Sequence, residues 1–569
     1  MTAVTLAVLP EIMRLRGAEQ PSRIAYTFLA DGETPTQSLT YAELDAAARG
    51  RATLLAEAGL AGGTAVLLYP SGLEFVATLL GCMTARVVSA PVQVPSRRQG
   101  LQRLRRIADD AGTTTVLTTE EVRRDFTERF AGAPELAGLR LLATDRPGAA
   151  GRTDWSGPSP HPDDIALLQY TSGSTGDPKG VRVTHANFGS NVAETDGLWP
   201  FEPGGTVVNW LPLFHDMGMV FGVVAPLWTG SPAFLMPPQA FIRRPARWLE
   251  AISRFHGTHA AAPSFAYEMC VRAAREDPAL PNRLDLSSWR VAANGAEPVR
   301  FSAMEDFIAA FAPAGLRRPA MCPGYGLAEN TLKATGSPGD REPTVLRLDP
   351  DALRAGRVVV GTTPVVGSGV TVGDTRVAIV DPLDLTAKPD DEVGEIWING
   401  PCVAGGYRGR TALNEEVFAA RIAGATDGRD WLRTGDLGFQ RDGELFVTGR
   451  IKDVIIRNGR NYYPQDIELS AEHAEPGLHP NCAAAFSVDD GQRELLVVVV
   501  EADGRALKAG PAEIRRRIVE AIRDGHRLEA DEVLLVRRGT LAKTSSGKVQ
   551  RGETRRRYVA GELGPRSVG

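Results

Sequence analysis

The chain has 569 residues, of which 43% are hydrophobic and 23% charged, with a formal net charge of −5 at pH 7. This length exceeds one ordinary domain, and the composition allows a sizeable core, so a large domain plus a smaller one is expected. The weakly acidic balance argues against a nucleic-acid binder that depends on a broad basic surface.

The cysteines lie far apart in the chain. They are Cys82, Cys270, Cys322, Cys402 and Cys482. This spacing predicts reduced, mostly buried thiols rather than a disulfide frame or a zinc site. The N-terminal residues show no basic segment ahead of an apolar stretch, so no signal peptide is predicted. The most apolar windows are too short or too interrupted to span a bilayer, and a cytoplasmic protein is expected.

Short β-branched runs alternate with helical patterns through most of the sequence. Residues 64–71 predict a strand before a helix that begins near Glu74, and residues 113–119 predict a strand before a helix that begins near Glu120. This alternation predicts parallel α/β layers.

Residues 170–180 read YTSGSTGDPKG and follow an apolar run at 165–168. Hydroxyls, glycines and Lys179 combine in a loop that can offer N–H groups, O–H groups and a positive charge to phosphate oxygens. Gly180 and Val181 follow Lys179, so this is not the loop that ends in Gly-Lys-Ser/Thr. A Ser/Thr/Gly loop alone is more often plain surface, but the full string with its Lys-Gly ending favours phosphate binding.

Two segments further along carry weaker signals. His215 and Asp216 follow the apolar run NWLPLF, and a lone His-Asp pair is more often structural. In AANGAEPV, residues 292–299, small side chains would let an adenine ring lie flat against backbone, and the Asn or Glu could bond its edge. An ordinary strand-to-helix turn explains that string equally well when it is taken alone.

The string CPGYGLAENT, residues 322–331, is more specific. Gly324 and Gly326 would permit a tight turn, and Tyr325 could stack on an adenine ring. Glu329 is a hard carboxylate suited to Mg²⁺. Because an unneutralised triphosphate repels an incoming carboxylate, a metal ligand near the phosphates is expected.

From residue 359 to 398 the segments are short, β-rich and separated by Gly, Pro and Asp, which predicts a mostly antiparallel β subdomain. A compact α+β pattern follows residue 449. We place the domain boundary at residues 449–453. The N-terminal domain is then 1–450, with its β-rich subdomain at about 355–450, and the small C-terminal domain is 451–569.

Two polar strings lie close to or within this small unit. In residues 431–468, Asp436 could accept both hydroxyls of a ribose because a carboxylate offers two acceptor oxygens, although alone it could be a turn residue. LAKTSSGKVQR places Lys548 on a Ser/Gly-rich loop near the C-terminus. An ammonium there could offset charge that develops when a carboxylate attacks a phosphate.

Together these strings closely resemble the adenylate-forming superfamily of acyl-CoA ligases, fatty acyl-AMP ligases, luciferases and adenylation domains of peptide synthetases. The resemblance implies an α/β fold. A large N-terminal domain of two layered α/β subdomains plus a β-rich subdomain would precede a small, mobile α+β C-terminal domain. It also implies ATP and Mg²⁺ as cofactors.

The resemblance assigns roles to individual positions. Lys548 would be the catalytic lysine and Glu329 the metal ligand. His215 would gate the acid beside the α-phosphate, and Lys452 would be the hinge of the small domain. The nucleotide-binding positions implied are Thr171, Ser172, Gly173, Ser174, Thr175, Gly176, Lys179, Gly295, Ala296, Glu297, Pro298, Gly324, Tyr325, Gly326, Leu327, Ala328, Asp436 and Arg450.

Several segments resemble the fatty acyl-AMP ligase branch in particular, among them LPLFHDMGM, residues 236–270 and GRNYYPQDIE. Residues 344–361 correspond to the extra segment of that branch. It restrains the small domain, so that CoA is rejected and the acyl group passes to the phosphopantetheine thiol of an acyl carrier protein. The chain departs from the branch at 365–369, where it reads VVGSG instead of Val-Ser-Cys-Gly after a shorter connection. This departure weakens the prediction that CoA is rejected, and it does not affect the prediction of adenylation.

The predicted function is a two-step ligase that converts a fatty acid to acyl-AMP, releases pyrophosphate and loads an acyl carrier protein. The acyl site is expected beside His215, with residues 219–231 on one wall and 255–266 on the other. These residues could equally be core, and Trp228 is a candidate for shortening the site.

Three alternatives stay open. They are a CoA ligase of the same fold, a non-catalytic nucleotide-binding homologue, and a peptide-synthetase adenylation domain, for which Asp216 is displaced by one residue. The arginines within 515–517, 537–538 and 555–557 could form a docking face for an acidic carrier protein. A solvated helix surface is the commoner origin of such runs.

Overall fold

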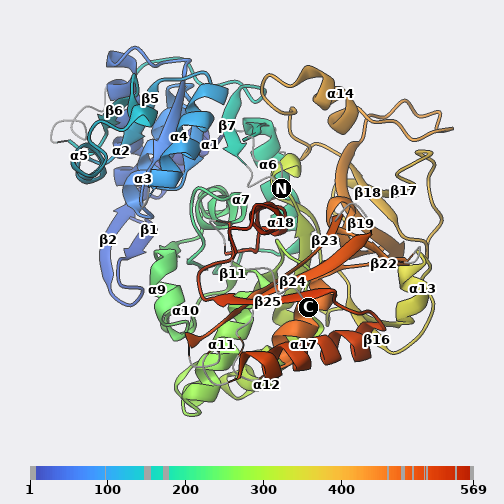
Figure 1. Ribbon diagram of the computed structural model, residues 1–569. Coiled ribbons are helices and arrows are strands. Elements are labelled where there is room, and N and C mark those ends of the chain that lie inside the picture. Colours follow the sequence, from blue (N-terminus) through green and yellow to red (C-terminus); the bar gives the residue numbers. More distant parts are fainter. Residues whose placement is uncertain are drawn as a thin grey trace.

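The computed structural model describes residues 8–95, 98–146, 155–170, 178–457, 460–475, 478, 481–489, 493–504, 507, 510–544 and 547–563, the side chain of Gln99 excepted. Within these ranges the fold is α/β, and it builds up from two helix-covered sheets, a β-rich region and a C-terminal α+β unit (Figure 1). The predicted fold class is confirmed.

The first sheet has the strand order β6-β5-β3-β4-β7-β8, and its neighbours are parallel except for β7 and β8. Its strands are β3 (Thr64–Leu68), β4 (Val88–Val92), β5 (Thr115–Thr118), β6 (Arg140–Ala143), β7 (Ile165–Tyr170) and β8 (Gly180–Thr184). The helices that precede or connect the first strands are α2 (Tyr41–Glu57), α3 (Leu73–Thr84), α4 (Arg98–Asp110) and α5 (Glu120–Arg129). The alternation of β-branched runs and helical patterns therefore gives parallel crossovers, as predicted.

The second sheet is larger, with the order β14-β13-β12-β11-β9-β10-β1-β2. Its strands are β1 (Ile24–Leu29), β2 (Pro35–Thr40), β9 (Val207–Asn209), β10 (Ala233–Leu235), β11 (His259–Ala262), β12 (Val291–Asn294), β13 (Met321–Gly326) and β14 (Lys333–Gly336). The helices along this part of the chain are α1 (Leu9–Glu19), α6 (His185–Leu198), α7 (Asp216–Met219), α8 (Ala225–Thr229), α9 (Pro238–Arg243), α10 (Ala246–Arg254), α11 (Ser264–Glu276) and α12 (Phe301–Phe311). From β13 to β1 the neighbours are parallel, so the carboxyl ends of these strands meet at one edge.

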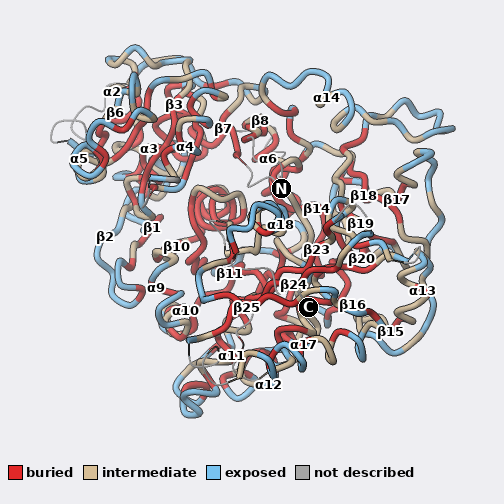
Figure 2. Tube along the Cα trace, viewed as in Figure 1, coloured by how far each residue is buried: buried red, intermediate tan, exposed pale blue. Residues whose placement is uncertain are grey.

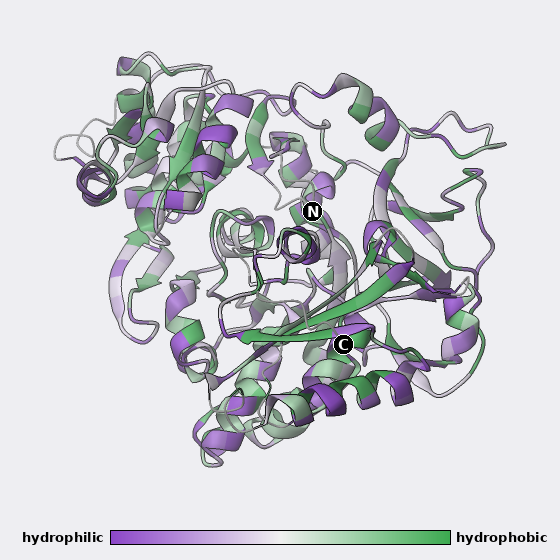
Figure 3. Ribbon diagram, in the orientation of Figure 1, coloured by the Kyte–Doolittle hydropathy of each residue, from purple (hydrophilic) through white to green (hydrophobic). Residues whose placement is uncertain are grey.

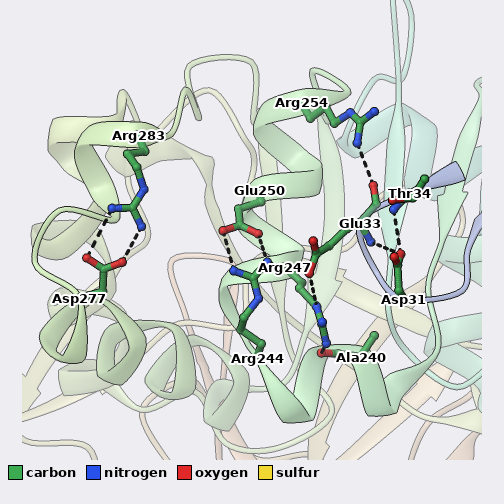
Figure 4. A network of polar contacts seen from close by, with 10 residues as sticks. All are labelled: Asp31, Glu33, Thr34, Ala240, Arg244, Arg247, Glu250, Arg254, Asp277 and Arg283. Carbon is green, nitrogen blue, oxygen red and sulfur yellow. Dashed lines mark hydrogen bonds and ion pairs between the residues drawn. The ribbon is translucent and has the colours of Figure 1, made fainter.

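A surface network of arginines and carboxylates ties the β1–β2 turn to α9 and α10 (Figure 4). Glu33 accepts from Arg244 at 3.0 Å and from Arg247 at 2.8 Å, and Arg254 donates to the Glu33 carbonyl at 2.9 Å. The charged groups are solvent-exposed to a large degree, so the network contributes modestly to stability and mainly fixes the turn.

The β-rich region follows as predicted. It contains an antiparallel sheet of β17 (Arg376–Val380), β18 (Gly394–Asn399), β19 (Leu432–Arg441) and β20 (Glu444–Arg450). The strands β15 (Val345–Leu348) and β16 (Thr363–Val366) form an antiparallel pair, and the helix α13 (Pro350–Arg354) lies between them in the chain. The helix α14 (Thr411–Phe418) lies between β18 and β19 in the chain.

The C-terminal unit is built around a sheet of β23 (Ala483–Asp489), β24 (Glu494–Ala502) and β25 (Glu532–Arg537), with a short pair β21 (Ile455–Arg457) and β22 (Arg460–Tyr462) before it. Its helices are α15 (Pro464–His473), α17 (Pro511–His526) and α18 (Arg551–Val559). The run LLVVVV is apolar at every position because both faces of β24 are covered. Leu496, Val498 and Val500 pack with α15 and α17, whereas Val497 and Val499 pack with Tyr558 of α18.

Figures 2 and 3 agree with the burial of both faces of β24. Figure 2 shows β23, β24 and β25 as buried, and Figure 3 colours the long strands at the position of β24 and β25 as hydrophobic. The cysteines are buried free thiols, as predicted, and burial raises the pKa of Cys82 to about 12. Among the described residues, none of the helices combines the length and apolar character needed to cross a bilayer.

Candidate functional site

One cavity of about 1560 Å³ joins the predicted site strings. Its walls come from the ends of both large sheets, from the β-rich region and from the C-terminal unit. The predicted site residues that line it are Lys179, His215, Gly295, Ala296, Glu297, Pro298, Gly324, Tyr325, Gly326, Leu327, Ala328, Glu329, Asp436, Arg450, Lys452 and Lys548. The other predicted positions, Thr171, Ser172, Gly173, Ser174, Thr175 and Gly176, lie outside the described residues.

Sheet topology explains this convergence. His215 lies beyond β9, Gly295 directly after β12 and Glu329 three residues after β13. Since β9, β12 and β13 run the same way in the second sheet, the segments that follow them emerge at one edge. The ends of β7 and β20 contribute Tyr170 and Arg450 to the same cavity.

The glycines of the GYG string have a different role from the one predicted. Gly324 and Gly326 lie within β13 rather than in a tight turn. A Cβ at Gly326 would lie 1.9 Å from the Leu332 carbonyl oxygen, because the antiparallel β14 crosses close by. Glycine is therefore required by a close backbone approach, and a Cβ at Gly295 would likewise lie 2.7 Å from the carbonyl oxygen of Gly324.

Asp436 is held by two neighbours. Its Oδ1 accepts from Nε of Arg450 at 2.7 Å, and its Oδ2 accepts from the hydroxyl of Tyr325 at 2.8 Å. The pairing of β19 with β20 places Asp436 directly opposite Arg450. Burial and the nearby Asp436 carboxylate raise the pKa of Tyr325 well above its ordinary value. Each carboxylate oxygen retains a further lone pair, so Asp436 can still accept from a diol.

Glu329 and Lys179 both contact Tyr407, a residue that the sequence interpretation missed. The hydroxyl of Tyr407 donates to Oε1 of Glu329 at 2.7 Å, and its ring centroid lies 5.2 Å from Nζ of Lys179. Tyr407 lines the cavity, and its backbone pairs with Val181 next to the Lys-Gly string. The sequence signal is slight, an aromatic residue after two glycines.

The cavity fits a divalent ion that takes most of its ligands from the substrate and water rather than from the protein. Among the described residues there is no group of three or more His, Cys, Asp or Glu side chains that could hold a metal. A lone carboxylate such as Glu329 is typical of Mg²⁺ sites, in which substrate phosphates and water complete the coordination.

His215, Asp216 and Lys548 form the charged end of the cavity. His215 Nδ1 lies 2.5 Å from Oδ1 of Asp216. Burial alone would raise the pKa of Asp216, but the adjacent His215 and Lys548 lower it overall. Burial lowers the pKa of Lys548, against the opposing effects of Asp216 and Glu297. Lys548 of the C-terminal unit is therefore inserted among carboxylates of the N-terminal part.

The Lys548 loop is docked by contacts on both sides. A Cβ at Gly547 would lie 3.2 Å from the Phe265 ring, so a larger side chain would push the loop away. Asn481 donates to the Gly547 carbonyl at 2.6 Å, and Thr544 and Lys548 bond each other through their backbones. The loop therefore presents Lys548 to the cavity.

Most of the predicted acyl walls do not line this cavity. Of the apolar residues in 219–231, Phe221 lines the cavity, whereas Met219, Val220, Val223 and Val224 are at most 1% exposed and belong to the large core. Trp228 is not a lining residue and packs against Gly189 of α6, and residues 255–266 do not line the cavity either. Apolar residues of the second sheet and its loops that do line the cavity include Trp199, Phe214, Met217, Phe221 and Leu332.

Ion pairs hold the C-terminal unit in this position. Arg300 donates to Glu268 at 3.2 Å and to Glu472 of α15 at 3.1 Å, so a guanidinium bridges the two parts of the chain. Within the C-terminal unit, Arg551 donates to both oxygens of Glu468 and to Asp453, which fixes the start of α18 against α15.

The extra segment 344–361 also touches the C-terminal unit. Asp351 of α13 accepts from Arg460 at 3.2 Å and lies 3.6 Å from Arg527. Arg354 lies over the Tyr462 ring, 5.1 Å from its centroid. These contacts join residues 344–361 to the C-terminal unit.

The helix-covered sheets, the inserted lysine and the shared cavity define an adenylate-forming enzyme. The chain belongs to the AMP-binding enzyme family, whose model matches residues 13–408, and a second model, described as the AMP domain of Disco-interacting protein 2-like proteins, matches residues 452–567. The recognition of the superfamily is therefore confirmed.

Relatives of the chain include ligases of fatty acids. The chain is 41% identical to the medium-chain-fatty-acid–acyl-carrier-protein ligase JamA of Moorena producens (strain JHB), over 99% of this chain and 97% of that relative. It is 35% identical to the long-chain-fatty-acid–AMP ligase FadD26 of Mycobacterium marinum, over 98% of both chains. The structure of a fatty acyl-adenylate ligase from L. pneumophila, in complex with acyl adenylate and pyrophosphate, is similar with a TM-score of 0.76 and 35% identity, covering 97% of this chain and 96% of that one.

Proposed function

We propose that this enzyme adenylates a fatty acid with ATP and Mg²⁺ and passes the acyl group to the phosphopantetheine thiol of an acyl carrier protein. One observation supports this above the others. Lys179, Glu329, Asp436, Arg450 and Lys548 come from distant parts of the sequence and line one cavity. Both the medium-chain ligase from M. producens and the long-chain ligase from M. marinum act on fatty acids by name.

The nucleotide would lie between the backbone of residues 295–298 and Tyr325. Asn294, at the end of β12, supports this placement because its buried Nδ2 has no hydrogen-bond partner among the described residues and it lines the cavity. Such a donor can serve an acceptor on the edge of a base. Asp436 and Arg450 would hold the ribose, and Lys179 with the 171–177 loop would hold the phosphates.

Glu329 would hold Mg²⁺ through the oxygen that does not accept from Tyr407. The ion would neutralise phosphate charge that otherwise repels the acid.

In the first half-reaction a carboxylate oxygen of the acid attacks the α-phosphorus, and the bond to pyrophosphate breaks. Lys548 offsets the negative charge that develops on the reacting oxygens, while His215 and Asp216 border the acid. Most of the rate gain comes from position and charge, because the protein forms no covalent bond to the substrate.

In the second half-reaction the thiolate of the carrier attacks the acyl carbon, and the carbon–oxygen bond to AMP breaks. We place the moving domain after residues 449–453, where β20 ends at Arg450 and the separate C-terminal clusters begin with Ile455. Lys452 lies exposed in this joint. Rotation about it would withdraw Lys548 and break the bond between Arg300 and Glu472.

Acid-dependent pyrophosphate exchange, followed by mass measurement of the acylated carrier protein, tests the proposal. Wild type should exchange pyrophosphate with fatty acids, and Lys548→Ala should not. Lys388→Ala, a change in the β-rich region outside the cavity lining, should behave as wild type. Exchange in wild type without any acid requirement would refute the proposal, and acyl-CoA as the sole product would favour the CoA ligase.

A further inference from the structure

Lys333 is a buried charged residue that the proposed chemistry does not use. It begins β14 and is 4% exposed, and it lines the same cavity as the predicted site. Among the described residues its Nζ has no hydrogen-bond partner. An ammonium that is buried without acceptors is costly, so such a group is retained where something compensates it.

The carboxylate of Glu194 partly compensates the charge of Lys333. Glu194 of α6 opposes the effect of burial, which lowers the pKa of Lys333, and the Cys402 thiol acts in the same direction as Glu194. However, the Glu194 carboxylate already accepts from the Thr375 backbone at 3.2 Å, the Thr375 hydroxyl at 2.7 Å and the Cys402 thiol at 3.4 Å. Lys333 makes no ion pair within 4 Å among the described residues, so its three N–H donors remain available.

The surroundings of β14 connect Lys333 with apolar residues that line the cavity. A Cβ at Gly336, the end of β14, would lie 2.6 Å from the Trp199 ring, so this ring lies directly against the strand. Trp199 in turn lies 6.0 Å from Phe221, centroid to centroid. Trp199, Phe221 and Lys333 all line the cavity.

Other donors on this wall are already used. The Trp199 indole donates to the Ser337 carbonyl at 2.8 Å, and the Thr335 hydroxyl donates to the Ser368 carbonyl at 2.7 Å. Lys333 is therefore a polar group with unused donors in a cavity wall that also contains the rings of Trp199 and Phe221. A plain alkyl chain would leave that ammonium without an acceptor.

We propose that Lys333 is a specificity-determining residue that selects an acid whose chain carries an oxygen acceptor, rather than an unsubstituted fatty acid. The acceptor is a hydroxyl, a carbonyl or a second carboxylate, each of which can accept from the ammonium. This inference rests on the proposed adenylation function and narrows its substrate class. The covalent chemistry is unchanged, because Lys333 touches the chain of the acid and not its reacting carboxylate.

The test measures kcat/KM for acyl-adenylate formation with acids of one chain length. The set contains the unsubstituted acid and derivatives with a hydroxyl, a ketone or a terminal carboxylate at successive positions. Wild type should prefer at least one substituted acid over the plain acid by roughly ten- to a hundredfold, the range of a hydrogen bond to a charged group. Lys333→Met, which keeps length and removes charge, should lose this preference and gain activity with the plain acid.

Glu194→Gln separates specificity from a purely structural pairing. If Lys333 selects the acid, Glu194→Gln retains the preference of wild type. If Lys333 serves only to neutralise Glu194, Lys333→Met lowers the melting temperature, the double variant restores it, and neither change alters the preference.

Equal kcat/KM values for all acids in wild type would overturn the inference, and this result needs no variant to fold. A different result would refute the proposed function itself, namely that no acid in the set gives an acyl-adenylate. If Lys333→Met does not fold, Lys333→Arg should keep the charge and retain the preference for the substituted acid. A preference that disappears in the folded Arg variant would also contradict the role of the charge.

Discussion

The hydroxyl of Tyr407 donates to Glu329 at 2.7 Å, and the ring of the same residue lies under the ammonium of Lys179. One aromatic side chain thus links the proposed metal ligand with the proposed phosphate ligand. The hydroxyl fixes one oxygen of Glu329 and does not occupy the other, while the ring restricts Lys179.

Tyr407→Phe should therefore raise the Mg²⁺ concentration for half-maximal pyrophosphate exchange by about tenfold or more, the effect of losing one hydrogen bond to a charged group. Tyr407→Leu should in addition raise the KM for ATP, because the contact with Lys179 is lost as well. Phe418→Leu is the matched control, since its ring packs edge-on against Tyr407 at 5.1 Å without reaching Glu329. A Mg²⁺ requirement that is identical in wild type and Tyr407→Phe would contradict the link.

Lys548 predicts a pH dependence of the first half-reaction. Its ammonium must be protonated to offset negative charge, and burial lowers its pKa below the ordinary lysine value of 10.5. Adenylation should decline as pH rises through this lowered pKa, and transfer from pre-formed acyl-adenylate should not show that decline. Lys548→Arg should remain charged and lose the alkaline decline, although with a lower rate. Pyrophosphate exchange against pH measures this, and identical alkaline limbs in both proteins would exclude Lys548 as the titrating group.

The sequence could predict which motifs line one cavity. Each motif is a short continuous segment, and the alternation of strands and helices places the segments that follow parallel strands at one edge of the sheet. It could not predict Tyr407 or Arg300, whose partners Glu329 and Glu472 lie 78 and 172 positions away and are brought close only by packing. Nor could apolar composition separate core from cavity wall, since both environments accept the same side chains. Val223 and Phe221 both belong to the large buried core, yet Phe221 also lines the cavity and Val223 does not.

The proposed docking face of the small domain is weakened by intramolecular pairing. Arg516 bonds Glu513 and Glu520, and Arg517 bonds Glu513 and Glu475. Arg556 and Arg557 are paired with nearby carboxylates or a carbonyl in the same way. Reversal of the charges at Arg516 and Arg556 should therefore leave the KM for carrier protein unchanged within about twofold, as for solvated surface pairs. A large rise in that KM, with normal adenylation, would restore the docking face.

Glu268 predicts a pH dependence of stability. Burial raises its pKa from 4.5 to about 7, although Arg300 acts in the opposite direction. A carboxyl group with a raised pKa contributes stability below its unfolded pKa and loses that contribution as pH rises toward the folded value. Glu268→Gln should therefore be neutral near pH 5 and stabilising at pH 8, by at most about 3 kcal/mol. Thermal unfolding at both pH values tests this, and a penalty from the substitution that is equal at both would reject the assignment.

The contacts of helix α13 with the C-terminal unit predict an effect on the choice between CoA and carrier protein as the acyl acceptor. Asp351 and Arg354 contact Arg460 and Tyr462 of the C-terminal unit, so their removal should free that unit to rotate further. The double variant Asp351→Ala, Arg354→Ala should adenylate the acid normally, because neither residue is one of the proposed nucleotide-binding positions, although Arg354 lines the cavity. It should form more acyl-CoA relative to acylated carrier protein than wild type, when both acceptors compete in one assay. Arg376→Ala, a change of an exposed arginine on β17, is the matched control. An unchanged product ratio, with intact folding, would show that these contacts do not restrict the acceptor, and rejection of CoA would then have to arise from the shape of the path to the adenylate.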